Sequence, residues 1–317
     1  MTIAAAQLLG PWSQAVRSQV VSELTPGRVW EVTTERGDHY VLKKVSTFNA
    51  PDPARRFTDE ARIVTYLLQR AVPVAVPVLS NDGRAYATDE DGALYAVFPM
   101  LPQGAANDGP ELDTVRYQNV GAAIARLHAA LADCPFGIES WVVRPALLPE
   151  LWRTAEERLP AAALTELSAR IRPRWDSIIA ALSAPPQRIH GDVHGGNILT
   201  DGQRVTGIID IDHLPLAPRG YDLGYYMAFA GRWWLDGDQP SRPIDEVRQL
   251  LTGYDAVSPL TQQENDDLPA LALAAALGLI SYFLTEHDLV EESWLRTVHW
   301  IDDNFGALRL PASDLGG

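Results

Sequence analysis

The feature that most constrains this chain is a polar segment enclosed by apolar, strand-like stretches within residues 189–212. Residues 190–197 read His-Gly-Asp-Val-His-Gly-Gly-Asn, and an apolar pair and an Asp-Gly turn follow them. Residues 203–211 then read as a second strand, which carries Asp210 near its end. A hairpin of this kind returns Asp210 to the neighbourhood of Asn197, so the sequence predicts a compact group of oxygen ligands.

The spacing of this segment fits the chemistry of phosphoryl transfer. A phosphotransferase needs a carboxylate that orients an attacking hydroxyl, and oxygen ligands that hold Mg2+ on the nucleotide phosphates. The pattern H-x-D-x-x-x-x-N supplies both from one loop, and His190, Asp192 and Asn197 fit it. We therefore predict Asp192 as the catalytic base, and Asn197 and Asp210 as the ligands of Mg2+.

The same residues resemble the aminoglycoside phosphotransferase and choline kinase family, which includes homoserine kinase-like members. The family loop reads H-G-D-x-H-x-x-N and is followed by an I-D-x-D metal motif, which matches residues 190–197 and 209–212. The resemblance extends to Leu127-His128 and to Tyr221-Asp222-Leu223-Gly224. It implies an α+β, protein-kinase-like fold of two lobes, with ATP and Mg2+ as cofactors.

Two assignments in this segment stay open from the sequence. His190 and His194 are alternative metal ligands, because histidine is a common ligand, although the family resemblance makes the first histidine structural. Asp212 either supports the metal ligands from outside or only solvates the end of the strand.

A second constellation lies in the first hundred residues. Strands over residues 28–34 and 39–45 form a hairpin, in which Val41 and Lys43 share a face. The chain has 24 arginines and only two lysines, Lys43 and Lys44, so a compact ammonium is favoured here. We predict that Lys43 binds the ATP phosphates and pairs with Glu60 on the following helix. Lys44 is the alternative phosphate ligand. The alternative without a function is that Lys43 is only a solvated lysine on an edge strand.

The segment that joins the two predicted lobes is the expected adenine site. By resemblance, Phe98 closes the back of the pocket, Pro99 offers its carbonyl and Leu101 offers its amide. Proline lacks an N–H, but only an acceptor is required at that position. An ordinary interdomain linker is the alternative interpretation.

The remaining pattern predicts two lobes, residues 1–102 and residues 103–317. The first lobe is expected to hold an antiparallel sheet and one helix over residues 57–69, with further strands at 74–79, 85–88 and 94–100. The second is expected to be mainly helical, with helices over residues 117–131, 147–159, 163–171, 175–182, 221–234 and 268–284.

Composition excludes several partner classes. A net charge of -15 disfavours binding to a nucleic-acid backbone, which requires clustered basic residues. The longest apolar stretch, about fourteen residues near Leu271 to Leu284, is shorter than the roughly 20 needed to span a bilayer, so no membrane span is expected. The single cysteine, Cys134, and the lack of a recognisable signal in residues 1–12 predict a cytoplasmic protein.

The acceptor is expected to be a small molecule with a hydroxyl group. Residues 201–317 hold 19 Asp and Glu against 7 Arg, a net of -12, which favours a neutral or cationic acceptor in this part. Trp233 and Trp234 are candidates to stack on it. One alternative is a protein Ser/Thr kinase, which is disfavoured because Asp222 follows Asp210 within twelve residues. The other is a pseudokinase, which is disfavoured because the base, metal ligand and lysine are present.

Overall fold

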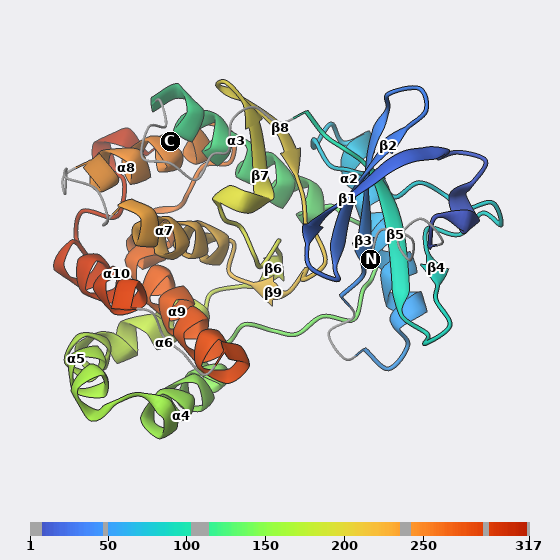
Figure 1. Ribbon diagram of the computed structural model, residues 1–317. Coiled ribbons are helices and arrows are strands. Elements are labelled where there is room, and N and C mark those ends of the chain that lie inside the picture. Colours follow the sequence, from blue (N-terminus) through green and yellow to red (C-terminus); the bar gives the residue numbers. More distant parts are fainter. Residues whose placement is uncertain (1–7, 47–49, 103–113, 235–241, 288–291, 316–317) are drawn as a thin grey trace. The chain divides into compact units, whose positions relative to one another are not determined.

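The computed structural model describes residues 8–46, 50–102, 114–234, 242–287 and 292–315. The chain packs as two compact units (Figure 1). The first comprises Met1–Pro102 with two later segments, Cys134–Glu139 and Gly207–Asp212, and the second comprises the rest. The sequence predicted a lobe boundary after residue 102. The first unit of the structure also contains the two short later segments.

The first unit is built on a five-stranded antiparallel sheet of order β1-β2-β3-β5-β4. The strands are β1 Ser18–Thr25, β2 Val29–Thr34, β3 His39–Lys44, β4 Ala87–Thr88 and β5 Leu94–Pro99. The predicted hairpin is β2 and β3, whose turn contains Gly37 at φ 84. In the register, Lys43 lies opposite Ala96 of β5, so the hairpin is fixed against the strand that leads to the adenine segment.

One prediction about this sheet was wrong, and one of its strands was missed. Residues 74–79 do not form a strand, apart from a single bridge of Val74 to Ile208, because Pro77 cannot donate to a ladder. Strand β1 was not predicted, although its segment pairs with β2 over most of its length.

Helix α2 (Pro53–Gln69) packs on one face of the sheet, where Phe57 joins Leu94 and Ala96 in a small core. The predicted start at Phe57 was wrong by four residues. Asp52 caps the helix by accepting the N–H of Arg55 at 2.9 Å, and Pro53 occupies the first turn, where its missing N–H is no loss.

The second unit is mainly helical. Its helices are α3 Thr114–Ala132, α4 Leu148–Arg158, α5 Ala161–Ile171, α6 Trp175–Leu182, α7 Gly220–Trp234, α8 Arg242–Asp255, α9 Gln262–His287 and α10 Glu292–Asp303. Helices α7, α9 and α10 lie side by side (Figure 1). Two short ladders accompany them, β6 (Gln187–Arg188) with β9 (Leu216–Ala217), and the hairpin of β7 (Ile198–Asp201) and β8 (Arg204–Ile208).

Helix α9 is the centre of this unit's core. It is 26 residues long and, by length and composition, is a candidate membrane span, but 78% of its apolar window is buried inside the protein. The sequence predicted a shorter helix here, over residues 268–284, and its apolar stretch was interpreted as part of a core helix. The burial agrees with that interpretation.

Helices α3 and α8 cross at close range. A Cβ on Gly121 would lie 1.9 Å from the carbonyl oxygen of Leu250, and one on Gly253 would lie 1.9 Å from that of Gln118. Only glycine allows this approach from both sides. Helix α8 was missing from the sequence prediction, as was α10, so the partner of α3 was not identified there.

Candidate active site

The predicted base, Asp192, is held on both oxygens of its carboxylate. The Tyr225 hydroxyl donates to Oδ1 at 2.7 Å, and the Asn197 side-chain nitrogen donates to Oδ2 at 2.9 Å. The His194 Nε2 atom lies 3.7 Å from Oδ2. The carboxylate is therefore fixed in orientation while its side chain remains 23% exposed, as an acid–base group that meets a substrate requires.

Asn197 ends a short 3-10 helix, Gly195–Asn197, and β7 begins at the next residue. Its side-chain nitrogen donates a second bond, to the backbone oxygen of Asp192 at 2.9 Å. Because the nitrogen makes both bonds, the amide oxygen is left for another partner. An amide oxygen is a suitable ligand for Mg2+.

The backbone of the loop that carries Asp192 is held by the side chain of Asp222. This carboxylate is buried and accepts the backbone N–H groups of His190 at 2.8 Å and Gly191 at 2.9 Å. Gly191 is at φ 86, and a Cβ there would lie 2.5 Å from the ring of Pro215. Any other residue at this position would therefore displace the loop.

Asp222 is itself held by a buried pair from two other helices. His128 Nε2 lies 2.9 Å from Asp222 Oδ2, and the Tyr254 hydroxyl lies 2.9 Å from His128 Nδ1. Burial raises the pKa of Tyr254 although Arg219 opposes the shift, so the phenol stays protonated. It donates to Nδ1, while Nε2–H donates to the carboxylate. His128 and Asp222 are the residues whose flanking motifs matched the family pattern.

Tyr225 was not identified from the sequence. Burial, and then the charge of Asp192, raise its pKa well above the ordinary value, so the hydroxyl remains a donor. Its only sequence signal is its position three residues after Asp222, which places both on one side of α7. The side chains of Trp233 and Trp234, the aromatic residues predicted instead, lie outside the described residues.

The first unit contains the other predicted residues. Lys43 Nζ lies 2.8 Å from Asp210 Oδ1 and 3.4 Å from Asp212 Oδ2. Burial alone would lower the pKa of Lys43, but the carboxylates of Asp212 and Asp210 outweigh it and raise the pKa above its ordinary value. Lys43 is therefore a permanent cation, whereas Lys44 is exposed.

Glu60 lies near this cluster without joining it. Among the described residues, no ion pair within 4.0 Å links Glu60 to Lys43, and Glu60 Oε2 is buried without a hydrogen-bond partner. Burial, followed by the charge of Asp212, raises the pKa of Glu60 well above its ordinary value. The pairing of Lys43 with Glu60 stays a prediction.

Asp210 has an unusual backbone. Its φ of 58 lies in the left-handed region, which aspartate tolerates better than most residues. Such conformations cluster at functional sites, where the surrounding structure fixes a side chain. The neighbouring Asp212 is almost buried, and its backbone oxygen accepts a bond from Arg56 at 2.7 Å. Its carboxylate is thus a partner of Lys43 rather than a solvated strand end.

The predicted adenine segment follows β5. The Met100 N–H donates to His39 in β3 at 3.0 Å. Because backbone groups alternate in direction along a strand, the Pro99 carbonyl turns away from β3. The Val97 carbonyl does the same and accepts the Val78 N–H at 2.7 Å. Among the described residues, the Leu101 amide takes part in no backbone hydrogen bond outside the regular elements, so the adenine contacts of Pro99 and Leu101 stay predictions.

The histidine alternative finds no support. The described residues contain no group of three or more His, Cys, Asp or Glu side chains arranged to hold a metal. His190 Nδ1 accepts the Asp192 N–H at 3.2 Å, and His194 Nδ1 accepts the Gly196 N–H at 3.1 Å. Both rings therefore shape the loop.

Comparison with known proteins agrees with this geometry. The model of the phosphotransferase enzyme family matches residues 20–260, which include every predicted site residue. The chain belongs to this family. The resemblance stated from the loop motif is thereby confirmed, and the protein is a phosphotransferase. The protein-kinase-like fold is confirmed by solved kinases that the chain matches over nearly its whole length.

Individual relatives illustrate the range of the family. A homoserine kinase from Methylobacillus flagellatus is 28% identical over 252 residues, 78% of this chain and 72% of that protein. A microcompartment-associated aminopropanol kinase has a TM-score of 0.72 at 19% identity, covering 98% of this chain and 99% of that one. The amicoumacin kinase hAmiN, solved with AMP-PNP, Ca2+ and Ami, has a TM-score of 0.70 at 19% identity and covers 95% of each chain.

Proposed function

We propose that this kinase transfers the γ-phosphoryl group of ATP to the hydroxyl of a small amino alcohol, hydroxy amino acid or amino sugar that is neutral or cationic overall. The observation that carries the proposal is the Asp192 carboxylate, oriented by Tyr225 and Asn197 and still open to solvent. In this role, Asp192 accepts the proton of the acceptor hydroxyl as the oxygen attacks the γ-phosphorus.

The remaining residues bind the nucleotide in this proposal. Lys43 contacts the phosphates, Glu60 orients Lys43, and the Pro99 carbonyl and the Leu101 amide hold adenine. Asn197 and Asp210 supply oxygen ligands to Mg2+, which neutralises the phosphate charge when it is bound. The donor set fits this metal, because both side chains offer hard oxygen atoms.

Lys43→Ala is expected to lower kcat/KM for ATP by about 10- to 100-fold, because a hydrogen bond between two charged groups contributes roughly 1.5–3 kcal/mol. Lys44→Ala is the matched control and should change kcat/KM for ATP by less than about twofold, since Lys44 is the exposed neighbour on the opposite face of β3. Steady-state kinetics with varied ATP give both values. A silent Lys43→Ala beside a damaging Lys44→Ala would contradict the assignment.

Asp210→Ala is expected to raise the Mg2+ concentration needed for half-maximal rate by at least about tenfold, because a charged ligand is lost. The measurement is the rate against free Mg2+ at saturating ATP. Asp201→Ala, an exposed carboxylate at the end of β7, is the control and should leave the curve unchanged. An Asp210→Ala enzyme with the wild-type Mg2+ response, or wild-type activity that survives EDTA, would refute the metal role.

Two observations support a neutral or cationic acceptor: the net charge of -12 over residues 201–317, and the aromatic rings beside Asp192. His194 stacks on Phe229 with ring centroids 4.3 Å apart, and Tyr225 stacks on the same ring at 6.3 Å. An aromatic wall in a negative field favours an ammonium group over a carboxylate.

Three related acceptors test this preference: homoserine, 3-aminopropan-1-ol, which lacks the carboxylate of homoserine, and 4-hydroxybutyrate, which lacks its amine. We expect kcat/KM for 4-hydroxybutyrate to be the lowest by about tenfold or more, since one charge pair near a surface contributes about 1–4 kcal/mol. The difference should shrink as salt is added. Preference for the anion, unchanged by salt, would eliminate the proposed acceptor class.

A further inference from the structure

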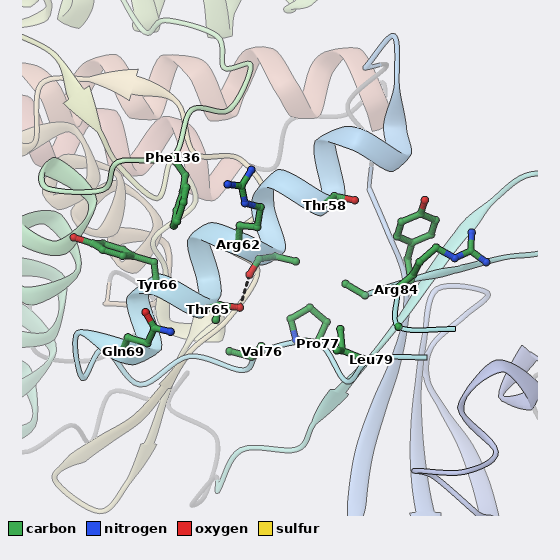
Figure 2. A pocket seen from close by; sticks show the side chains of 14 residues that line it. Thr58, Arg62, Thr65, Tyr66, Gln69, Val76, Pro77, Leu79, Arg84 and Phe136 are labelled. Atoms are coloured by element: carbon green, nitrogen blue, oxygen red, sulfur yellow. Dashed lines mark hydrogen bonds between the residues drawn. The ribbon is translucent and has the colours of Figure 1, made fainter. Parts of the chain in front are cut away.

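The first unit contains a cavity of about 430 Å3 beside α2 (Figure 2). Helix α2 supplies one wall, the segment 76–86 supplies another, and Phe136 closes one end. Its volume lies near the lower limit for ligand sites, about 300–1,000 Å3, so it suits a molecule of metabolite size.

The cavity and Glu60 occupy opposite faces of one helix. Gln69, which lines the cavity, lies nine residues after Glu60, about two and a half turns, which places it half a turn around the helix. Arg62 and Thr65 line the cavity from that same face, and Thr65 Oγ1 bonds back to the Ala61 oxygen at 2.7 Å (Figure 2). A molecule in the cavity would therefore contact the helix directly behind Glu60.

The lining combines aromatic rings with guanidinium groups. The Arg62 guanidinium lies 4.6 Å from the centre of the Phe136 ring, and that of Arg84 lies 5.2 Å from the centre of Tyr86. The Tyr66 ring meets Phe136 edge to face at 6.1 Å. Such surfaces bind flat apolar groups through their faces and edges.

The charges around the cavity favour a single negative charge on the ligand. Arg84 is tied to Asp82 at 2.6 Å, whereas the ion pair of Arg62 with Asp59 is long, 3.5 Å, and the Arg62 side chain is 56% exposed. Because two carboxylates already balance two guanidinium groups, a polyanion such as a nucleotide is disfavoured. A carboxylate can exchange for Asp59 on Arg62, whose planar donors match it.

We propose that this cavity binds a small aromatic monocarboxylate, which regulates the kinase through α2. The ring lies against Tyr66 and Phe136, and the carboxylate bonds to Arg62. A ligand behind α2 holds the opposite face of the helix, with Glu60, toward Lys43, and so favours nucleotide binding. The regulatory part of this proposal rests on the proposed function, whereas the binding part does not.

Binding is tested first, without ATP or acceptor, by calorimetric titration with phenylacetate and indole-3-acetate and with their neutral amides. We expect both acids to bind and both amides to bind at least about tenfold more weakly, since a charge-assisted hydrogen bond contributes roughly 1.5–3 kcal/mol. Arg62→Gln should weaken acid binding by a similar factor. Arg55→Gln, which removes an 80% exposed arginine that pairs with the same Asp59 from outside the cavity, should change it by less than about twofold.

A filled cavity supplies the second test. Thr65→Phe should abolish acid binding, and its melting temperature shows whether the variant is folded. Binding of neither acid at about 10 mM, equal binding of acids and amides, or equal effects of the two arginine variants would overturn the proposed site.

Regulation is measured as KM for ATP with and without a saturating acid. We expect the acid to lower KM for ATP by about fivefold or more, which is the lower limit of typical coupling between sites. In Thr65→Phe the acid should leave KM unchanged. Tight binding with an unchanged KM would overturn the regulatory role alone. An enzyme with no phosphotransfer would overturn the proposed function and leave the titrations interpretable.

Discussion

Asp192→Asn is expected to lower kcat by about 10²- to 10⁴-fold, the usual contribution of a positioned acid–base group. Asparagine keeps the size of the side chain and can still meet the Tyr225 hydroxyl and the Asn197 amide, but it cannot accept the acceptor's proton. Steady-state turnover and the affinity for an ATP analogue should be measured together.

The analogue should bind the Asp192→Asn variant within about twofold of wild type, because the proposed nucleotide contacts are made by other residues. Asp201→Asn, an exposed carboxylate four residues after Asn197, is the control for a general effect of losing a charge and should retain full turnover. Near-normal turnover of Asp192→Asn would remove Asp192 from the role of base.

Asp222→Ala is expected to lower the free energy of unfolding by about 3–5 kcal/mol, because each buried donor that is left without an acceptor costs roughly 1–3 kcal/mol. The substitution leaves the buried N–H of His190, that of Gly191 and the His128 Nε2–H without their acceptor. Urea denaturation gives the free energy, with Asp176→Ala as a control.

Asp176 is an exposed carboxylate in the first turn of α6, and its loss should cost no more than about 1 kcal/mol. The Asp222→Ala variant should also lose activity under conditions in which it remains folded, because the loop that carries Asp192 loses its support. A stability change as small as that of the control would show that the Asp222 anchor is not needed to hold the loop.

The geometry of the loop that carries Asp192 was predictable because its contacts are local. Asp192 and Asn197 lie five residues apart, and the bond between their side chains is determined by that spacing. Tyr225 was not predictable, because 33 residues separate it from Asp192 and only the packing of α7 brings them together. Its spacing from Asp222 was a signal, but one that any helical tyrosine can show.

The partners of Lys43 show the same limit. The sequence predicted that Val41 and Lys43 share a face of their strand, and the structure pairs Lys43 with Asp210, 167 residues away. Local patterns favoured Glu60, the acidic residue on the next helix. A contact across that separation depends on how the segment Gly207–Asp212 packs into the first unit, which periodicity does not encode.

Errors in the fold have equally specific causes. The start of α2 was placed at Phe57 because apolar spacing was followed and the Asp52-Pro53 start signal was overlooked. Residues 74–79 are apolar and β-branched, but Pro77 prevents a ladder. Helix α8 was missed although Ile244, Val247, Leu251 and Tyr254 follow helical spacing.

The central claim is that the chain moves a phosphoryl group from ATP to a hydroxyl, and 31P NMR of the reaction mixture measures this directly. With ATP, Mg2+ and a panel of hydroxylated amines and amino acids, we expect ADP and one phosphate monoester to appear in equal amounts. Both signals should depend on the acceptor and should be absent with Asp192→Asn. Formation of ADP and inorganic phosphate at a rate independent of every acceptor, or no turnover with any of them, would contradict the account.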